Sequence, residues 1–229
     1  MLVRFIYKGE RFMSMKRLSA IVAALALFAT PSMAFNIGFG ISGAGLGAQT
    51  EGEETLKTSK VKTSAAEEQA AFIPAGYVEV TLWDNGIVVG YEKVANMQSL
   101  GSKRNSRMDL PSGDSASGVN QKVSASIDKH HTIYVETPSF MGMYLKLGYS
   151  EVDVITDEEL GTGAVYGNFT MDGTTVGIGA KHNNGRGMVV KFETFYTDYD
   201  AFSVTSDSGN TIAGDVEAVG AKFAVGYQF

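Results

Sequence analysis

The chain has no cysteine, only four prolines, three histidines and one tryptophan among its 229 residues. The absence of cysteine excludes a disulfide framework, a thiolate metal site, a cysteine nucleophile and a lipoprotein anchor. A run of 18 apolar residues is also missing, which excludes a conventional transmembrane helix but not a protein that crosses a membrane with strands. The net charge of −6 argues against a general nucleic-acid binder, so no nucleic-acid partner is expected.

Residues 15–34 have the composition of a secretory signal peptide. Lys16 and Arg17 form a basic start, an apolar segment follows from Leu18 to Ala29, and Ser32-Met33-Ala34 forms a small-x-small cleavage site. A buried amphipathic helix is the alternative interpretation. We therefore expect residues 1–34 to be an over-extended start plus a signal peptide, and residues 35–229 to be the exported domain.

The exported part is strongly acidic. Residues 1–34 hold five basic residues and one acidic residue, so residues 35–229 have 14 basic and 24 acidic residues and a net charge of −10.

Glycine and aromatic residues are abundant: the chain has 27 Gly, 13 Phe and 10 Tyr. In the segment that ends the chain, every second residue from Val219 to Phe229 is apolar, and the residues between them are small or polar. This period of two predicts a strand with one apolar face. Residues 35–41 have the same pattern, as expected if the first and last strands pair to close a barrel.

The same alternation predicts eight strands in total, at about 35–42, 77–83, 87–92, 123–136, 143–150, 175–181, 188–193 and 212–229. Long polar loops are expected over 51–72, 97–120 and 157–172, and a medium loop around 206–210. Short turns are expected at Asp84-Asn85-Gly86, Thr137–Gly142 and Asn183–Gly187. This arrangement predicts an all-β fold, an eight-stranded antiparallel up-and-down transmembrane β-barrel, with both termini on the periplasmic side.

Polar residues of the predicted inward face suggest how the lumen is filled. An eight-stranded barrel leaves an interior that side chains just fill, and unpaired charges there are costly. A network of ion pairs is therefore expected among Glu79, Glu92, Asp128, Glu136, Lys146, Lys191, Glu193 and Lys222. A narrow channel is the alternative. The outward aromatic residues Tyr91, Tyr149, Phe192, Tyr227 and Phe229 fit an interface girdle.

Catalytic and metal sites have weak support in the sequence. Strand alternation sends His130 inward and His131 outward, so the pair cannot share one metal. Asp128, Ser124 and Ser126 precede this pair, but the spacing of a lipid hydrolase is not evident. No catalytic residue, metal site or cofactor is predicted.

The signal peptide, the strand alternation from Phe35 onward and the aromatic C-terminus resemble the small eight-stranded bacterial outer-membrane β-barrels of the OmpX, OmpA-barrel and opacity-porin type. This resemblance implies location in the outer membrane of a Gram-negative cell, contact with outer-membrane lipid, and Tyr227 and Phe229 as an assembly signal read by the barrel-assembly machinery.

A family of this kind does not fix one function. A structural or surface-interaction role with an unknown extracellular ligand is the first hypothesis. A small-solute porin is the second and a lipid-modifying enzyme the third. A secreted soluble β-barrel, with its apolar face inside, remains the rival fold.

Overall fold

Residues from Phe35 to the C-terminus form β-strands, as their period-two pattern predicts. The computed structural model describes residues 35–57, 60–82, 86–107, 119–159 and 165–229, and within these ranges the regular structure consists entirely of strands. The strands are β1 (Phe35–Thr55), β2 (Lys62–Leu82), β3 (Ile87–Val94), β4 (Gln98–Arg107), β5 (Val119–Glu136), β6 (Met143–Glu159), β7 (Phe169–Asn183), β8 (Met188–Thr205) and β9 (Thr211–Gln228). The predicted signal peptide lies outside the described residues.

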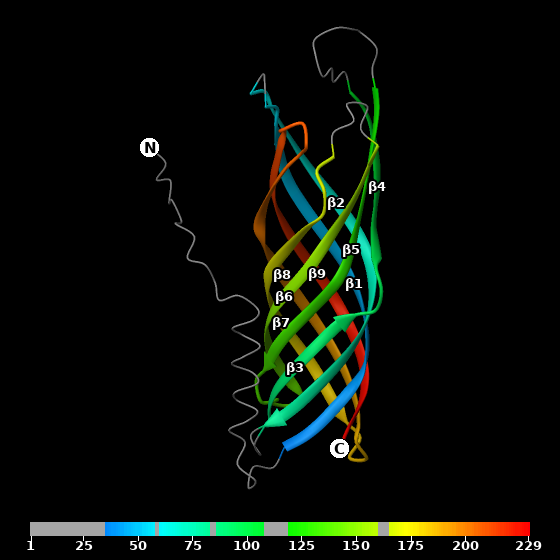
Figure 1. Ribbon diagram of the computed structural model, residues 1–229. Helices are drawn as coiled ribbons and strands as arrows, with labels where there is room; N and C mark the ends of the chain where they lie inside the picture. The colour runs from blue at the N-terminus through cyan, green and yellow to red at the C-terminus, as the bar shows by residue number, and fades with distance from the viewer. Residues whose placement is uncertain (1–34, 58–59, 83–85, 108–118, 160–164) are drawn as a thin grey trace, which may run out of the picture. The chain divides into compact units, whose positions relative to one another are not determined.

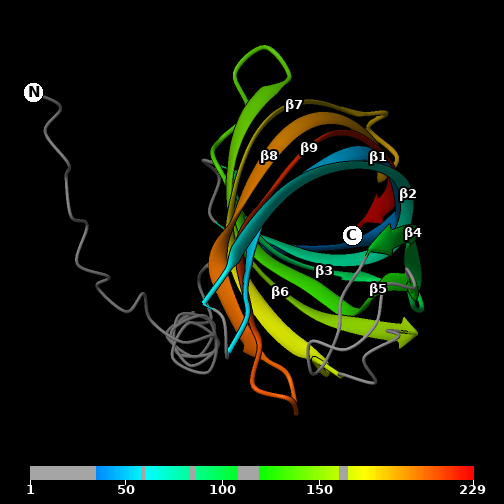
Figure 2. The same cartoon turned by 90° about the horizontal axis from the view of Figure 1, so that it is seen from above.

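The strands close into an antiparallel ring (Figures 1 and 2). From β5 to β9, and again from β1 to β3, each strand pairs with the next one along the chain, and β3 pairs with β5. The first and last strands pair from Gly38↔Gln228 to Thr55↔Thr211, which closes the barrel. The predicted all-β, eight-stranded antiparallel barrel is confirmed.

One position in the ring is shared by two strand segments. β3 pairs with both β2 and β5, whereas β4 continues upward and pairs with β5. The ladder between β2 and β3 ends at Ala75↔Val94, followed by one bond from Ala95 N to the carbonyl oxygen of Pro74. Pro74 has no N–H to donate, and Asn96 has a φ of 64°, so both residues interrupt the ladder here.

The prediction of long loops over 51–72, 97–120 and 157–172 is wrong where the structure has strand: over 51–55 and 62–72, over 98–107 and 119–120, and at both ends of 157–172. Residues 58–59, 108–118 and 160–164 of these loops lie outside the described residues. β1 and β2 stay paired from Phe35↔Leu82 to Thr55↔Lys62, so residues 51–55 and 62–72 are strand. Gln98–Arg107 forms β4, β6 continues to Glu159, and β7 begins at Phe169. In β1 and β2, small and charged residues occupy both faces of the extensions, so the apolar alternation disappears although the backbone pairing continues.

A β-bulge in β5 changes which residues face the lumen. Asp128 pairs with Asp153 and His131 pairs with Glu151, so β5 has one more residue than β6 across this step. Lys129 has a φ of 49° at the same place. Because an extra residue reverses the alternation, Ile127 is buried in the lumen, whereas Ile133 and Val135 lie on the outer wall.

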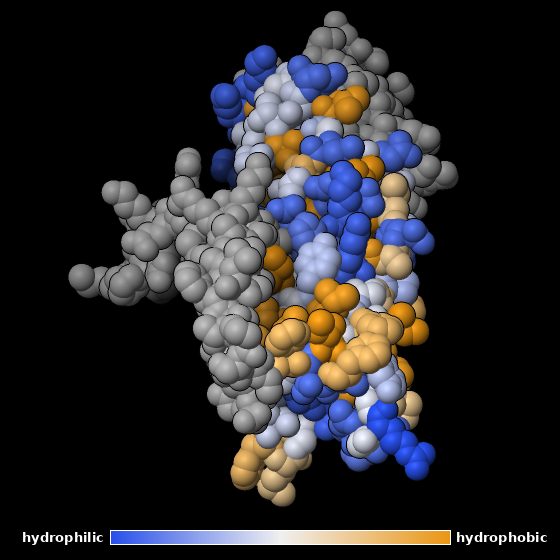
Figure 3. All heavy atoms as spheres, turned by 60° about the horizontal axis from the view of Figure 1, so that its bottom comes forward, coloured by the Kyte–Doolittle hydropathy of each residue, from blue (hydrophilic) through white to orange (hydrophobic). Residues whose placement is uncertain are grey.

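The outer wall carries an apolar band near the end where Phe35 and Phe229 lie, part of which is visible in Figure 3. Its exposed side chains include Phe35, Ile37, Phe39, Ile41, Val78, Tyr91, Val135, Met143, Leu145, Leu147, Val176, Ile178, Met188, Phe192, Tyr196, Val219, Phe223, Val225 and Tyr227. About ten residues of a tilted strand suffice to cross a bilayer, which matches the width of this band. Within the described residues, no helix is long and apolar enough to cross a membrane.

Candidate functional site

The membrane-level lumen holds a cluster of ion pairs, which we call the ionic cluster. It consists of four glutamates and four lysines from seven strands: Glu79, Glu92, Glu136, Lys146, Lys181, Lys191, Glu193 and Lys222. The positive and negative charges are equal in number. Burying an unpaired charge in a closed lumen is costly. Because the opposite charges are equal in number, every charge of the cluster can have a partner.

The ionic cluster has two halves with two acids and two bases each. In the first half, Lys191 binds Glu79 and also lies 2.8 Å from Glu136, while Lys181 approaches Glu136 at 3.3 Å. Glu136 is 1% exposed, so its carboxylate is shielded from solvent. These contacts link β2, β5, β7 and β8 through side chains.

The second half joins β3, β6, β8 and β9. Lys146 lies 3.1 Å from Glu193, and Lys222 bridges Glu92 at 2.7 Å and Glu193 at 3.5 Å. Ser42 of β1 donates a hydrogen bond to Glu92 at 3.2 Å. Strands on opposite sides of the ring are therefore held together across the lumen.

Tyrosines connect the two halves. Tyr134 donates its hydroxyl to Glu79 at 2.6 Å, and the Lys146 ammonium lies 4.0 Å from the centre of the same ring. Tyr144 donates to Glu193 at 3.1 Å. The aromatic rings fill space between the charges and supply donors to the carboxylates.

Inward-facing glycines make room for these rings. A Cβ on Gly90 would overlap the Tyr134 ring, and one on Gly179 would overlap the Tyr144 ring. Gly226 faces the hydroxyl of Tyr77 in the same way. Each tyrosine ring thus lies against a glycine, which has no side chain, on a neighbouring part of the barrel wall.

A chain of hydroxyl groups lies above the ionic cluster, that is, on its side away from the end of the barrel that carries Phe35 and Phe229. Thr132 and Ser150 are 2.8 Å apart, Ser150 and Thr175 are 3.1 Å apart, and Thr175 and Thr197 are 2.8 Å apart. All four residues are buried, and they come from four consecutive strands, β5 to β8. Each hydroxyl can donate to the next, so the layer satisfies its own polar groups.

His130 lies above the hydroxyl chain, at the β5 bulge. Its Nε2 is 3.3 Å from the Tyr199 hydroxyl, and its buried Nδ1 has no hydrogen-bond partner among the described residues. Ser126 and Asp128 pair with Ile155 and Asp153 on the outer wall, away from His130. The structure therefore does not bring the candidate histidine, serine and acid together.

Apolar side chains fill the lumen above His130. The buried members are Ile73, Ala75, Val94, Ile127, Val152, Val154 and Met171, and Leu46, Phe169, Phe202 and Val216 pack against them. The lumen thus holds a charged layer, a hydroxyl layer and an apolar layer in succession.

Seven of the eight residues expected in the interior network lie together in the ionic cluster. Asp128 does not: the bulge places it on the outer wall opposite Asp153. The structure adds Lys181, Tyr77, Tyr134 and Tyr144 to the site. The strand alternation places these four residues on the inward face. Their residue types gave no further sign of a role in the lumen, because a lysine can also be solvated near a turn and a tyrosine can also lie at the membrane interface.

Above the apolar band, the outer wall is acidic. Asp153 accepts hydrogen bonds from Thr170 at 2.7 Å and Lys129 at 3.1 Å, which lower the pKa of its carboxyl group. Burial and the neighbouring carboxylates of Asp172 and Asp198 raise the pKa of Asp200. Among the described residues, no group of three or more potential metal ligands is placed to hold a metal ion.

The terminal aromatic residues pack against each other at the opposite end. The rings of Tyr227 and Phe229 are 5.0 Å apart, and the Phe229 ring is 5.8 Å from that of Phe39. The amide of Phe229 donates to the carbonyl oxygen of Ile37. These contacts join the end of the chain to β1.

No protein-family model and no curated protein matches the chain. Among solved structures, it is similar to the outer membrane protease OmpT from Escherichia coli, with 12% identity, coverage of 88% of this chain and 100% of that one, and a TM-score of 0.49. It is also similar to Ail, the attachment invasion locus protein of Yersinia pestis (11% identity, 83% and 99% coverage, TM-score 0.37), and to Neisserial surface protein A (11%, 79% and 95%, 0.31).

The class of the protein follows from its own architecture. The ring of strands leaves no open edge at membrane level, the apolar side chains face outward, and the charged side chains face the lumen. This is the reverse of a soluble β-barrel, and it satisfies the backbone hydrogen bonds as a bilayer requires. The protein is a small transmembrane β-barrel.

Proposed function

We propose that this protein is a non-conducting, non-enzymatic anchor that presents a rigid wall and loops at the cell surface for contact with other molecules. The observation that carries the proposal is the filled lumen. The space lined by the side chains of the ionic cluster and by Tyr77, Tyr134 and Tyr144 measures about 10 Å³. Such a space holds no more than one water molecule, and no solute.

The apolar layer supports the same proposal. A solute that passed the ionic cluster and the hydroxyl chain would then meet Ile127, Val152 and Met171, which are buried in one apolar cluster. A polar solute would lose its hydration there without gaining partners. A conduit would require both layers to rearrange.

The wall above the apolar band provides the surface for contact. β1 and β2 continue for about ten residues beyond the band, which is roughly 30 Å along the strands. The side chains of this upper wall include many acids: Glu51, Glu53, Asp172, Asp198, Asp200, Asp215 and Glu217. Such a surface attracts basic partners.

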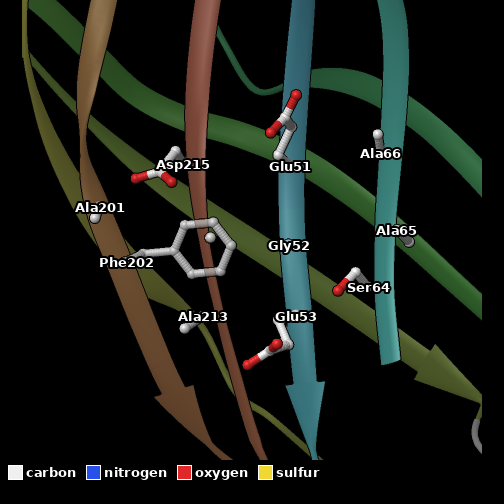
Figure 4. Close-up of a pocket in the computed structure, with 11 residues that line it drawn as sticks. Glu51, Gly52, Glu53, Ser64, Ala65, Ala66, Ala201, Phe202, Ala213 and Asp215 are labelled. Carbon is white, nitrogen blue, oxygen red and sulfur yellow. The ribbon is translucent and has the colours of Figure 1, made fainter. Parts of the chain in front are cut away.

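A shallow depression lies in this upper wall (Figure 4). Gly52 of β1 pairs with Gly214 of β9, so neither residue of this pair has a side chain, and the ring of Phe202, which packs into the lumen, lies against Gly214. Glu51, Glu53 and Asp215 flank the depression. It offers a surface of small residues flanked by carboxylates.

Contacts between loops hold the top of the wall in place. Asp207 accepts a bond from Val165 N and donates its own amide to the Val165 carbonyl oxygen. Lys57 N donates to the Asn210 side chain. The β1–β2, β6–β7 and β8–β9 connections are therefore tied together, as a fixed contact surface requires.

The surface role is tested by binding of a nonalysine peptide to the folded protein in nanodiscs of neutral lipid. We expect binding that weakens at least tenfold when Asp172, Asp198, Asp200 and Glu217 are replaced by Asn or Gln, and that weakens with salt. A matched control replaces Gln69 and Ser203, exposed neutral residues of the upper wall, by Ala. Equal binding by the wall variant and the unchanged protein would reject the acidic wall as the contact surface.

A further inference from the structure

The turn between β5 and β6 has an unusual residue at its tip. Phe140 and Met143 exchange two backbone hydrogen bonds of 2.9 Å, which leaves Met141 and Gly142 as a two-residue loop. Met141 has a φ of 52° and Gly142 a φ of 84°. Two positive φ values define the hairpin turn that normally takes Asn-Gly or Asp-Gly. A methionine in the left-handed conformation is unfavourable, so an ordinary turn would not select it.

The tip of this turn is apolar and exposed. Met141 is 88% exposed and Phe140 is 78% exposed, the two highest values among the large apolar residues described. No residue from Thr137 to Gly142 is charged. An unfavourable backbone that displays two large apolar side chains indicates a role for them outside the turn.

The turn is held firmly in place. Gly142 accepts a 2.7 Å hydrogen bond from Lys181 N on β7, and Thr137 exchanges bonds with Leu145 through its backbone and its hydroxyl. The tip therefore does not fold back onto the barrel to hide its side chains.

The neighbouring turn at the same end has the opposite character. Asn183 and Asn184 accept bonds from Gly185 N and Arg186 N, and Gly185 and Gly187 take the positive φ values. This turn uses residues suited to its geometry and to water. The contrast shows that the geometry of a short turn at this end does not require an apolar tip.

The apolar tip continues the apolar band. Met143 and Leu145 follow it directly on β6 and face outward, 53% and 57% exposed. We propose that Phe140 and Met141 insert into the interfacial layer of the membrane leaflet on this side and fix the depth of the barrel at β5 and β6. The occupant is lipid rather than a protein partner because the tip is continuous with the lipid-facing band and carries no charge or hydrogen-bonding side chain.

The proposal is tested by fluorescence quenching in phosphatidylcholine vesicles. Trp83, the single tryptophan, is replaced by Phe, and Met141→Trp then reports the environment of the tip. We expect blue-shifted emission and loss of most of the fluorescence with lipids brominated near the headgroup end of the acyl chains. Arg186→Trp, at the tip of the polar turn, is the matched control and should keep its fluorescence.

Phe140→Trp in the same background repeats the measurement where φ is unconstrained, in case the Met141 variant does not fold. Folding is checked by heat-modifiable gel mobility. The proposal would be overturned if brominated lipid did not quench the tryptophan at the tip of a folded variant. It would also be overturned if the tryptophan at residue 186 were quenched to the same extent. Protection only on addition of a periplasmic protein would likewise replace lipid by a protein partner.

Discussion

Gly90 of β3 lies directly beneath the ring of Tyr134 on β5, so close that even a methyl group at residue 90 would overlap the ring. The two strands are paired at this point, since Gly90 and Tyr134 are register partners. The tyrosine can turn across the neighbouring strand and reach Glu79 only because residue 90 has no side chain. A small residue on one strand thus determines where a donor on the next strand can lie.

We predict that Gly90→Ala lowers the free energy of unfolding by about 1–3 kcal/mol, the usual cost of overpacking. Urea unfolding of the folded protein in lipid vesicles measures it. Gly45→Ala is the control, because nothing lies within 4 Å of a Cβ at that position. A Gly90→Ala protein as stable as the control would show that the Tyr134 ring is not confined by Gly90.

Lys191→Met should destabilise the barrel by about 3–5 kcal/mol, since it leaves Glu79 and Glu136 without their shared cation in a closed lumen. The same unfolding assay applies. Lys62→Met is the control, because Lys62 pairs with Glu53 at an exposed position of the upper wall and such pairs contribute little. Similar losses for both variants would contradict a dry, balanced cluster.

The pKa of Asp153 is predicted to rise toward its ordinary value of about 4 in Thr170→Val, because the hydrogen bond from Thr170 is the main cause of its lowering. Carboxyl carbon NMR of the folded protein measures the titration. In the unchanged protein the lowered pKa stabilises the folded wall above the ordinary carboxyl pKa, and that contribution is lost as the pH falls through the lowered value. Thr170→Val should lose it at higher pH. An unchanged titration would show that Thr170 does not bind the carboxylate.

The sequence predicted the barrel because bilayer and lumen impose opposite demands on alternate residues. Wherever β-strands cross the apolar band, as in Phe35–Ile41 and Val219–Tyr227, the period of two is strict and the strand was predictable. The upper wall meets water outside and small or mixed residues inside. The pattern therefore disappears in β1 beyond Glu51 and in the first part of β2, and these strands were predicted as a loop.

The ionic cluster was largely predictable for the same reason, since a charged residue at membrane level can only face inward. Asp128 was wrongly predicted to face the lumen because a single extra residue in β5 reverses the alternation. The sequence Asp128-Lys129-His130 contains no residue that would predict a bulge. Which lysine pairs with which glutamate, as for Lys222 and Glu92, depends on the register between distant strands. The sequence of either strand alone does not determine that register.

The most direct test of the closed-anchor proposal is current through planar bilayers that contain the purified, heat-modifiable protein. We predict no single-channel steps for the unchanged protein. Steps should appear only when Lys146, Glu193, Lys222 and Glu92 of the ionic cluster are replaced by serine, the apolar layer is opened by Ile127→Ala, Val152→Ala and Met171→Ala, and the variant still folds. Stable, reproducible steps from the unchanged protein would contradict the account.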